Sequence, residues 1–220
     1  MGTALITGAN RGIGLELCRQ LAARGDDVIA ACRRSNPALD ALGVRVEAGV
    51  DVASDAAVAA LAARLSGVSL DLLINNAGIL ERNALESMDY DSARRQFEVN
   101  SLGPLRVTAA LLPNLDRGSK VAIITSRMGS IGDNTSGSHY GYRMSKAAVN
   151  IAGVSLARDL APRGIAVALL HPGYVRTEMT GGHGLTDAAT SAAGLIARID
   201  ALRLASTGGF WHAEGQALPW

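Results

Sequence analysis

The sequence predicts an α/β fold, a Rossmann-type doubly wound parallel β-sheet flanked by helices, in a single domain over residues 1–220. Short apolar runs alternate with helical patterns along the chain, and this alternation is typical of parallel sheets with right-handed crossovers. The composition is 48% hydrophobic with few aromatic residues, which suits strands that are buried on both faces. A length of 220 residues is enough for one sizeable domain and short for two.

The expected strands and helices follow one another in a regular order. Residues 4–6 form the first buried strand, and Gly25 ends the helix after it. Ser54 is a suitable N-cap for the next helix, and the longest helix is expected to kink near Gly103 and Pro104. The other strands are expected at 28–31, 44–46, 70–74, 121–124, 165–170 and, at the sheet edge, 210–211, and the helices at 13–24, 55–65, 89–112, 140–161 and 186–204.

A glycine-rich turn follows the first strand. In doubly wound sheets, ligands bind where the strands end at the carboxyl edge, so this turn is a candidate site. Its glycines permit a tight turn and a close approach of the backbone to a pyrophosphate. The candidate dinucleotide contacts in this turn are Gly8, Asn10, Arg11, Gly12, Ile13 and Gly14.

Two arginines, Arg33 and Arg34, follow the second strand. An NAD-binding domain usually has an acidic residue here that holds the ribose 2′-hydroxyl. Guanidinium groups suit a 2′-phosphate instead, and Arg11 in the glycine turn adds a third. The pattern favours NADP(H) over NAD(H), with Arg33 as the main contact and Arg34 as the weaker of the pair. The alternative is that these are solvated surface arginines.

Tyr142 and Lys146 are four positions apart in a helical pattern and therefore lie on one helix face. The lysine ammonium is expected to favour the phenolate and to lower a tyrosine pKa that starts near ~10. Such a phenol can give a proton to a carbonyl oxygen or take one from an alcohol. A single Tyr-x-x-x-Lys pair is also common on solvated helices without function, so the hypothesis depends on the other motifs.

Together, these motifs resemble those of the short-chain dehydrogenase/reductase superfamily. The matches are T-G-x-x-x-G-[IL]-G in the glycine turn, N-N-A-G at 75–78, S-x-x-G from Ser126, the Tyr-x-x-x-Lys pair, and P-G-x-V-x-T from Pro172. The resemblance covers residues 7–177 and implies that residues 1–220 are one domain of this superfamily. It implies the catalytic residues Asn100, Ser126, Tyr142 and Lys146.

The same resemblance implies further cofactor contacts. Asp51 and Val52 would contact the adenine, and the N-N-A-G residues would line the adenine ribose. Tyr142 and Lys146 would also contact the cofactor. The remaining implied contacts are Asn75, Ala77, Gly78, Pro172, Gly173, Val175 and Thr177.

The serine that orients the substrate has two candidates. Tyr142 follows Ser126 by 16 positions, a few more than is usual in the superfamily, and the extra length falls in the polar loop 132–138. Ser130 is consequently a rival. Ser126 is favoured because it stands where the strand ends and the crevice begins.

The implied activity is the NADPH-dependent reduction of an aldehyde or ketone to an alcohol, with Tyr142 as the general acid. Residues 126–130 and 208–220 resemble the C-factor branch of short-chain carbonyl reductases, which includes proteins described as developmental cell-contact signals. The alternative is therefore an NADP(H)-binding signalling protein with little or no turnover. The resemblance also implies a homodimer or homotetramer, and the short glycine-rich segment 178–185 predicts an open pocket without naming the substrate.

Composition argues against several other classes of protein. A net charge of +1 gives no reason to expect nucleic acid or an anionic membrane as a partner, and no apolar run approaches the ~20 residues of a membrane helix. The first strand begins near Thr3, which leaves no room for a signal peptide. Two cysteines, Cys18 and Cys32, and four scattered histidines predict neither a disulfide nor a metal site. A cytoplasmic location is expected.

Overall fold

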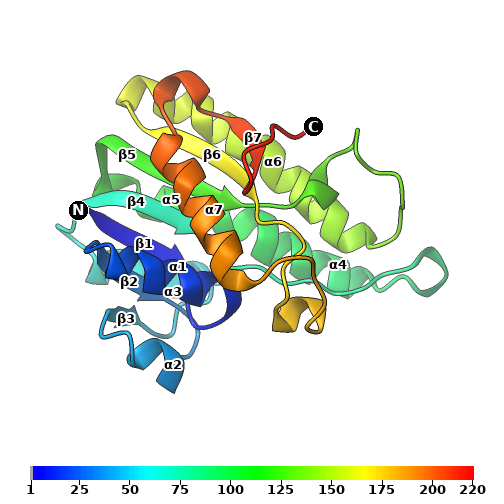
Figure 1. Cartoon of the computed structure of the whole chain (residues 1–220), viewed down its shortest axis with the longest axis horizontal. Helices are drawn as coiled ribbons and strands as arrows, with labels where there is room; N and C mark the ends of the chain where they lie inside the picture. The colour runs from blue at the N-terminus through cyan, green and yellow to red at the C-terminus, as the bar shows by residue number, and fades with distance from the viewer. Residues whose placement is uncertain (1) are drawn as a thin grey trace.

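The computed structural model describes residues 2–220 and contains a seven-stranded parallel sheet in the order β3-β2-β1-β4-β5-β6-β7. Because the chain runs outward from β1 to β3 and then returns to pair β4 with β1, the topological switch point lies between β1 and β4. The carboxyl ends of the strands point to the right in Figure 1. The strands are β1 (Thr3–Thr7), β2 (Asp27–Ala31), β3 (Arg45–Glu47), β4 (Leu70–Asn75), β5 (Leu115–Ile124), β6 (Ala166–His171) and β7 (Gly209–His212).

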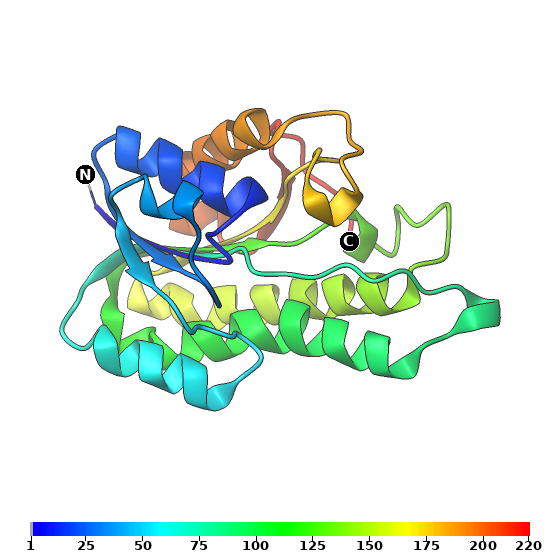
Figure 2. The ribbon, with the colours of Figure 1, turned by 90° about the horizontal axis from the view of Figure 1, so that it is seen from below.

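Helices cover both faces of this sheet. Figure 2 shows α1 and α7 on one side and α3, α4, α5 and α6 on the other. No helix within residues 2–220 combines the length and the apolar character needed to cross a membrane. The helices are α1 (Gly12–Ala23), α2 (Pro37–Asp40), α3 (Asp55–Arg64), α4 (Tyr90–Phe97), α5 (Gly103–Ala110), α6 (Tyr140–Leu160) and α7 (Ala188–Ala201).

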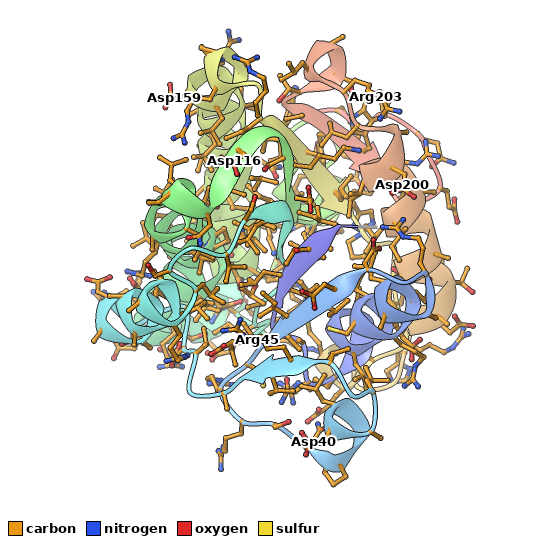
Figure 3. All side chains as sticks on the ribbon, turned by 90° about the vertical axis from the view of Figure 1, so that its left-hand side faces the viewer. Asp40, Arg45, Asp116, Asp159, Asp200 and Arg203 are labelled. Atoms are coloured by element: carbon orange, nitrogen blue, oxygen red, sulfur yellow. The ribbon has the colours of Figure 1, made fainter. Side chains whose placement is uncertain are left out.

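Strand side chains fill two separate cores, one on each face. Ile6 of β1 packs in the core below α1 and α7, whereas its neighbour Leu5 packs in the core below α3, α5 and α6. Both are fully buried, as the alternation of side chains along a strand requires. Exposed charges such as Asp116, Asp200 and Arg203 are seen in Figure 3 on the side away from the carboxyl ends of the strands.

The predicted doubly wound sheet and the order of its elements are confirmed. Ser54 caps α3, since its side chain accepts a hydrogen bond from the Ala57 N–H at 3.2 Å. Gly25 adopts a φ of 91° after α1, and β7 is the predicted edge strand. The short helix α2, capped by Asn36, was not expected because only four residues form it.

The expected long helix over 89–112, kinked near Gly103 and Pro104, is present as one run from Tyr90 to Ala110 with an irregular turn directly before these two residues. It is divided into α4, a π-helical turn over Glu98–Leu102, and α5. Pro104 explains the wide turn, because proline has no N–H to donate to the carbonyl four residues earlier and its ring crowds that carbonyl. The irregularity therefore precedes Gly103 and Pro104 and includes Asn100. Single π turns of this kind are frequent at functional sites.

Gly153 allows α6 to lie directly against β5 and β6. A Cβ at this position would be 2.7 Å from Leu169 Cδ2 and 3.2 Å from Ile123 Cδ1. We predict that Gly153→Ala lowers the free energy of unfolding by ~1–3 kcal/mol through overpacking, although alanine is the better helix former. Urea unfolding measures the change.

The matched control for this substitution is Ser155→Ala, at an exposed position of the same helix. Its effect should remain within about 0.5 kcal/mol, as for most surface substitutions. Equal unfolding midpoints for the two variants would show that α6 can move away from the sheet without cost.

Candidate active site

A cleft of about 450 Å³ runs along the carboxyl edge of the sheet, across the switch point between β1 and β4. Ligands of doubly wound folds bind at this place. Most of the residues proposed from the sequence meet here. Those that line the cleft are Gly8, Asn10, Arg11, Gly12, Ile13, Gly14, Arg33, Asp51, Val52, Ala77, Gly78, Tyr142, Lys146, Pro172 and Thr177.

The glycine turn brings the start of α1 against the end of β1. Gly8 and Gly12 adopt φ values of 66° and 54°, which favour glycine. At Gly14 a Cβ would collide with the Gly8 carbonyl oxygen and lie 2.6 Å from Asn76 Nδ2. The turn thus places the first residues of α1 in the lining of the cleft, and a helix N-terminus attracts phosphate.

Asn75 is a correction to the sequence-based site. Its side chain leaves the cleft and donates a hydrogen bond to Thr108 Oγ1 of α5 at 3.0 Å. Asn76 lines the cleft instead, and its amide donates to the carbonyl oxygens of Thr7 and Gly8. Successive residues at a strand end point to opposite faces. To predict which of these two asparagines lines the cleft, one must know at which residue the strand ends and which way each side chain points.

The basic end of the cleft is formed by Arg11, Arg33 and Arg34. The Asn10 side chain donates to the Arg34 carbonyl oxygen at 3.0 Å, and the Asn36 side chain donates to the Asn10 carbonyl oxygen at 2.7 Å. These two bonds hold the loop after β2 against the glycine turn, and Arg34 belongs to the cleft as fully as Arg33 does.

Among the contacts of residues 2–220, Arg11 is the one arginine of this group with an ion pair. Its Nη1 lies 2.6 Å from Glu178 Oε2. Both side chains are more than half exposed, so the pair contributes little to stability. Arg11 therefore remains able to turn toward another anion in the cleft.

Tyr142, Lys146 and Ser126 come together where β5 ends beside the first turns of α6. Lys146 Nζ donates to the Ile124 carbonyl oxygen at 2.9 Å and lies 5.8 Å from the centroid of the Tyr142 ring. The Ser126 hydroxyl accepts a hydrogen bond from the Met128 N–H at 3.1 Å and lies close enough to the phenol to lower the pKa of Tyr142. All three side chains are buried, at 7%, 5% and 7% exposure for Tyr142, Lys146 and Ser126.

Burial controls the protonation of this group. It raises the pKa of Tyr142 to about 12, although the neighbouring Ser126 hydroxyl acts in the opposite direction. Burial also lowers the pKa of Lys146 to about 8. The expected lowering of the tyrosine pKa by the lysine is therefore not found, and desolvation raises this pKa instead. At neutral pH the phenol keeps its proton and can donate it.

Asn100 lies in the π turn behind Lys146 rather than in the cleft lining. Its Oδ1 accepts from the Ile79 N–H at 2.8 Å, and its Nδ2 donates to the Ile79 carbonyl oxygen at 2.9 Å and to Ser145 Oγ at 3.0 Å. A Cβ at Gly78 would be 3.2 Å from Asn100 Oδ1 and 3.8 Å from Lys146 Nζ. Asn100 therefore ties the segment after β4 to α6 beside the lysine.

Ser130 is directed away from Tyr142. Its hydroxyl donates to the Trp220 carbonyl oxygen at 3.1 Å and accepts from the Asp133 N–H at 3.0 Å. The geometry therefore favours Ser126 over Ser130 as the serine beside the phenol.

Gly173 and Val175 lie in the segment after β6, next to the cleft residue Pro172. Neither of them lines the cleft, and Val175 is buried.

A histidine pair near this group was missed by sequence reasoning. His171 and His212 are register partners at the ends of β6 and β7, with ring centroids 4.9 Å apart. Burial and the cationic groups around it lower the pKa of His171 to about 3. Residues 2–220 contain no cluster of three or more potential metal ligands, so the pair has no third ligand beside it. The two histidines are far apart in the sequence, and only the pairing of β7 with β6 brings them together.

The comparisons with known proteins agree on one family. A family model described as short chain dehydrogenase matches residues 2–187. The 1-hydroxy-2-glutathionyl-2-methyl-3-butene dehydrogenase of Rhodococcus sp. (strain AD45) is 49% identical over 226 residues, covering 100% of both chains. C-signal of Myxococcus xanthus is 47% identical over 154 residues, covering 69% of this chain and 93% of C-signal.

The fold is also that of a solved carbonyl reductase. The structure of the NADPH-bound carbonyl reductase from chicken fatty liver matches with a TM-score of 0.91 at 29% identity. The match covers 100% of this chain and 99% of that one. The two chains therefore share the fold over their whole length.

The buried lysine makes stability depend on pH. Folding lowers the pKa of Lys146 from 10.5 to about 8. Between these values the unfolded chain binds more protons than the folded chain, so stability rises with pH across this interval. We predict that Lys146→Met raises the free energy of unfolding near pH 7 by up to ~3 kcal/mol.

Urea unfolding at several pH values between about 7 and 10 measures this effect. The advantage of Lys146→Met over the natural protein should shrink steadily as the pH rises. If Lys146→Met raises the free energy of unfolding by the same amount at every pH, removal of the buried ammonium group is not the cause of its greater stability.

Proposed function

The chain belongs to the short-chain dehydrogenase family, and on that premise we propose that it is an NADPH-dependent carbonyl reductase. It would reduce an aldehyde or ketone to the corresponding alcohol. The observation that carries the proposal is the buried group of Ser126, Tyr142 and Lys146 at the edge of a cleft that begins with a glycine turn. Binding alone does not require a positioned proton donor.

NADP(H) fits the residues of the cleft. Gly14 lets α1 begin directly against the end of β1, since a Cβ there would collide with the Gly8 carbonyl oxygen, and the helix N-terminus that this packing brings to the cleft suits a pyrophosphate. Arg33 and Arg34 are exposed at the far end of the cleft, where guanidinium groups would hold a 2′-phosphate. The carbonyl reductase from chicken fatty liver was solved with NADPH bound, which supports the same cofactor here.

The chemistry assigned to the chain is proton transfer. When bound, NADPH supplies the hydride that is added to the carbonyl carbon. Tyr142 donates its phenolic proton to the carbonyl oxygen, and the Ser126 hydroxyl holds that oxygen beside the phenol. The Lys146 ammonium favours the phenolate that remains after the transfer. General acid catalysis of this kind contributes typically ~10²–10⁴-fold.

Two related functions remain as second candidates. The Rhodococcus relative is named a dehydrogenase of a glutathionyl alcohol, which supports a test of alcohol oxidation with such a thioether among the substrates. The similarity to C-signal supports the alternative of an NADP(H)-binding signalling protein with little turnover. The intact group of Ser126, Tyr142 and Lys146 favours the enzyme.

We also propose that residues 1–220 act as one domain and that the protein forms a homodimer or homotetramer. Phe97 of α4, Leu105 of α5, and Met144 and Ile151 of α6 are exposed apolar side chains on the helices that cover one face of the sheet. Burial of these side chains between two copies would stabilise such an assembly.

The first test of the reductase is Tyr142→Phe. We expect turnover of NADPH with a panel of aldehydes, ketones and quinones to fall by ~10²–10⁴-fold, because the proton donor is lost. The Kd for NADPH should change little, since the ring and its packing remain. Steady-state kinetics and a fluorescence titration of NADPH measure the two quantities. Undiminished turnover in this variant would refute the assignment of Tyr142.

The second test concerns the choice of cofactor. Arg33→Ala should weaken NADPH binding by ~10-fold or more, in line with the loss of a charge-assisted hydrogen bond, and should leave NADH binding nearly unchanged. Arg94→Ala, at an exposed position of α4 outside the cleft lining, is the control and should affect neither cofactor. Equal weakening of NADPH and NADH by Arg33→Ala would contradict the 2′-phosphate assignment.

A further inference from the structure

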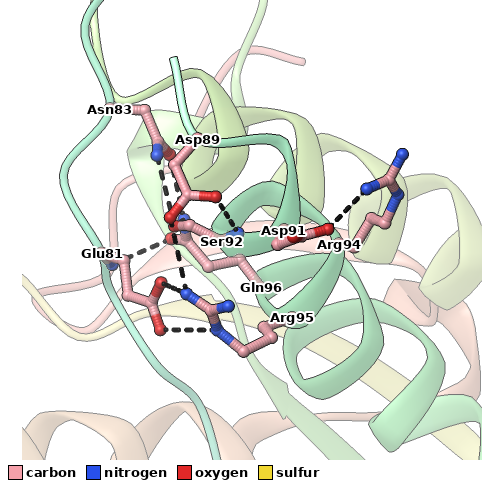
Figure 4. A network of polar contacts seen from close by, with 8 residues as sticks. All are labelled: Glu81, Asn83, Asp89, Asp91, Ser92, Arg94, Arg95 and Gln96. Atoms are coloured by element: carbon pink, nitrogen blue, oxygen red, sulfur yellow. Dashed lines mark hydrogen bonds and ion pairs between the residues drawn. The ribbon is translucent and has the colours of Figure 1, made fainter. Parts of the chain in front are cut away.

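A buried cluster of amide and hydroxyl groups lies outside the cleft, between α4 and the segment after β4 (Figure 4). Gln96 is fully buried at its centre. Its Oε1 accepts from the Glu81 N–H at 3.0 Å, and its Nε2 donates to Asn83 Oδ1 at 3.1 Å and to Ser92 Oγ at 3.2 Å. Asn83 Nδ2 also donates to Ser92 Oγ at 3.2 Å. Every hydrogen-bonding atom of the Gln96 amide therefore has a partner.

This cluster determines where α6 begins. The Asn83 carbonyl oxygen accepts from the His139 N–H at 2.9 Å and from Ser138 Oγ at 3.3 Å. Ser138 and His139 adopt φ values of 58° and 52°. Left-handed backbone is costly for residues other than glycine and persists where the surroundings over-determine it. The two bonds to Asn83 provide that constraint immediately before the helix.

The first turn of α6 also rests directly on the amides. A Cβ at Gly141 would be 2.7 Å from Gln96 Nε2, 2.8 Å from Asn83 Oδ1 and 2.9 Å from Ala93 Cα. No side chain separates the helix backbone from the cluster at this point. Tyr142 is the next residue, so any shift of Gln96 or Asn83 is transmitted to the backbone that carries the phenol.

We propose that Gln96 is a positioning residue, which acts through Asn83 and Gly141 to hold the phenol of Tyr142 in its productive place. This inference rests on the proposed reductase function. An amide is suited to the role because one side chain accepts from Glu81 and donates to Asn83 and Ser92 at the same time. A displacement of about 1 Å at a reacting group can cost ~10²-fold in rate.

The polar contacts farther out in Figure 4 are of a different kind. Arg94 pairs with Asp91 on the exposed surface of α4, and the more exposed Arg95 pairs with the partly exposed Glu81 of the segment after β4; ion pairs this open to solvent contribute little. Arg95 is therefore a matched control. It is the neighbour of Gln96 and contacts the same segment, but within residues 2–220 no hydrogen bond or ion pair joins its side chain to α6.

The test is Gln96→Met, which keeps the length and volume of the side chain and removes all of its hydrogen bonds. We expect kcat to fall roughly 10-fold, part of the loss a misplaced reacting group can cause, with the Kd for NADPH changed by less than about 2-fold. Arg95→Ala should leave kcat unchanged. Asn114→Leu removes a buried amide that donates to Leu65 and Val68 at the amino-terminal edge of the sheet, opposite the cleft, and should lower thermal stability without lowering kcat per folded molecule.

The same substitution in a Tyr142→Phe background separates positioning from general damage. If Gln96 acts through the phenol, Gln96→Met should cause little further loss of kcat there. An equal loss of kcat in both backgrounds, or a loss of stability with unchanged kcat, would refute the proposal. If Gln96→Met does not fold, Gly141→Ala decides, since its Cβ presses on the cluster from the other side and should give the same selective loss of kcat.

The two proposals fail in different ways. Tyr142→Phe with full turnover would refute the proposed function. Tyr142→Phe without turnover, together with Gln96→Met at full kcat, would refute only the role of Gln96.

Discussion

The contact between α6 and the end of β5 is the constraint on which the candidate site depends. At Gly129, in the 3₁₀ turn after Ser126, a Cβ would lie 2.6 Å from the Lys146 carbonyl carbon, so the turn rests on the helix backbone itself. Thr125 Oγ1 adds a hydrogen bond of 2.6 Å to Asn150 Oδ1. The serine, tyrosine and lysine meet because no side chain separates these two elements, and Gly153 extends the same close approach along the helix.

The same contact that assembles the group also buries it, and burial has opposite effects on its two titrating members. The neutral form is favoured for both, so the pKa of Tyr142 rises and that of Lys146 falls. A cation in this position costs stability, and the Ile124 carbonyl oxygen offsets part of that cost by accepting a hydrogen bond. Destabilised groups of this kind are common where a protein performs chemistry.

Local sequence patterns were enough to predict the features that depend on neighbouring residues. The glycine turn, the Ser54 cap and the Tyr142–Lys146 spacing are of this kind, because each rests on backbone geometry within one or two turns. The sequence could not predict that Asn76 lines the cleft and Asn75 does not, since neighbouring residues of a strand point to opposite faces and the exact end of the strand decides which side chain faces the cleft. The direction of the tyrosine pKa was missed for a related reason, because spacing reveals the lysine and not the depth of burial.

The unusual length between Ser126 and Tyr142 is compatible with an ordinary site for a physical reason. The loop between them is held at its ends: Ser130 bonds to the Trp220 carbonyl oxygen, and the Arg143 guanidinium donates to the Gly137 and Ser138 carbonyl oxygens. The start of α6 is set by contacts with the segment after β4, and the place of Ser126 is set by β5. Neither depends on how many residues the loop contains, because each end is fixed by a different part of the sheet. The distance that matters to the chemistry is therefore the one between β5 and α6, and the chain length between them is free to vary.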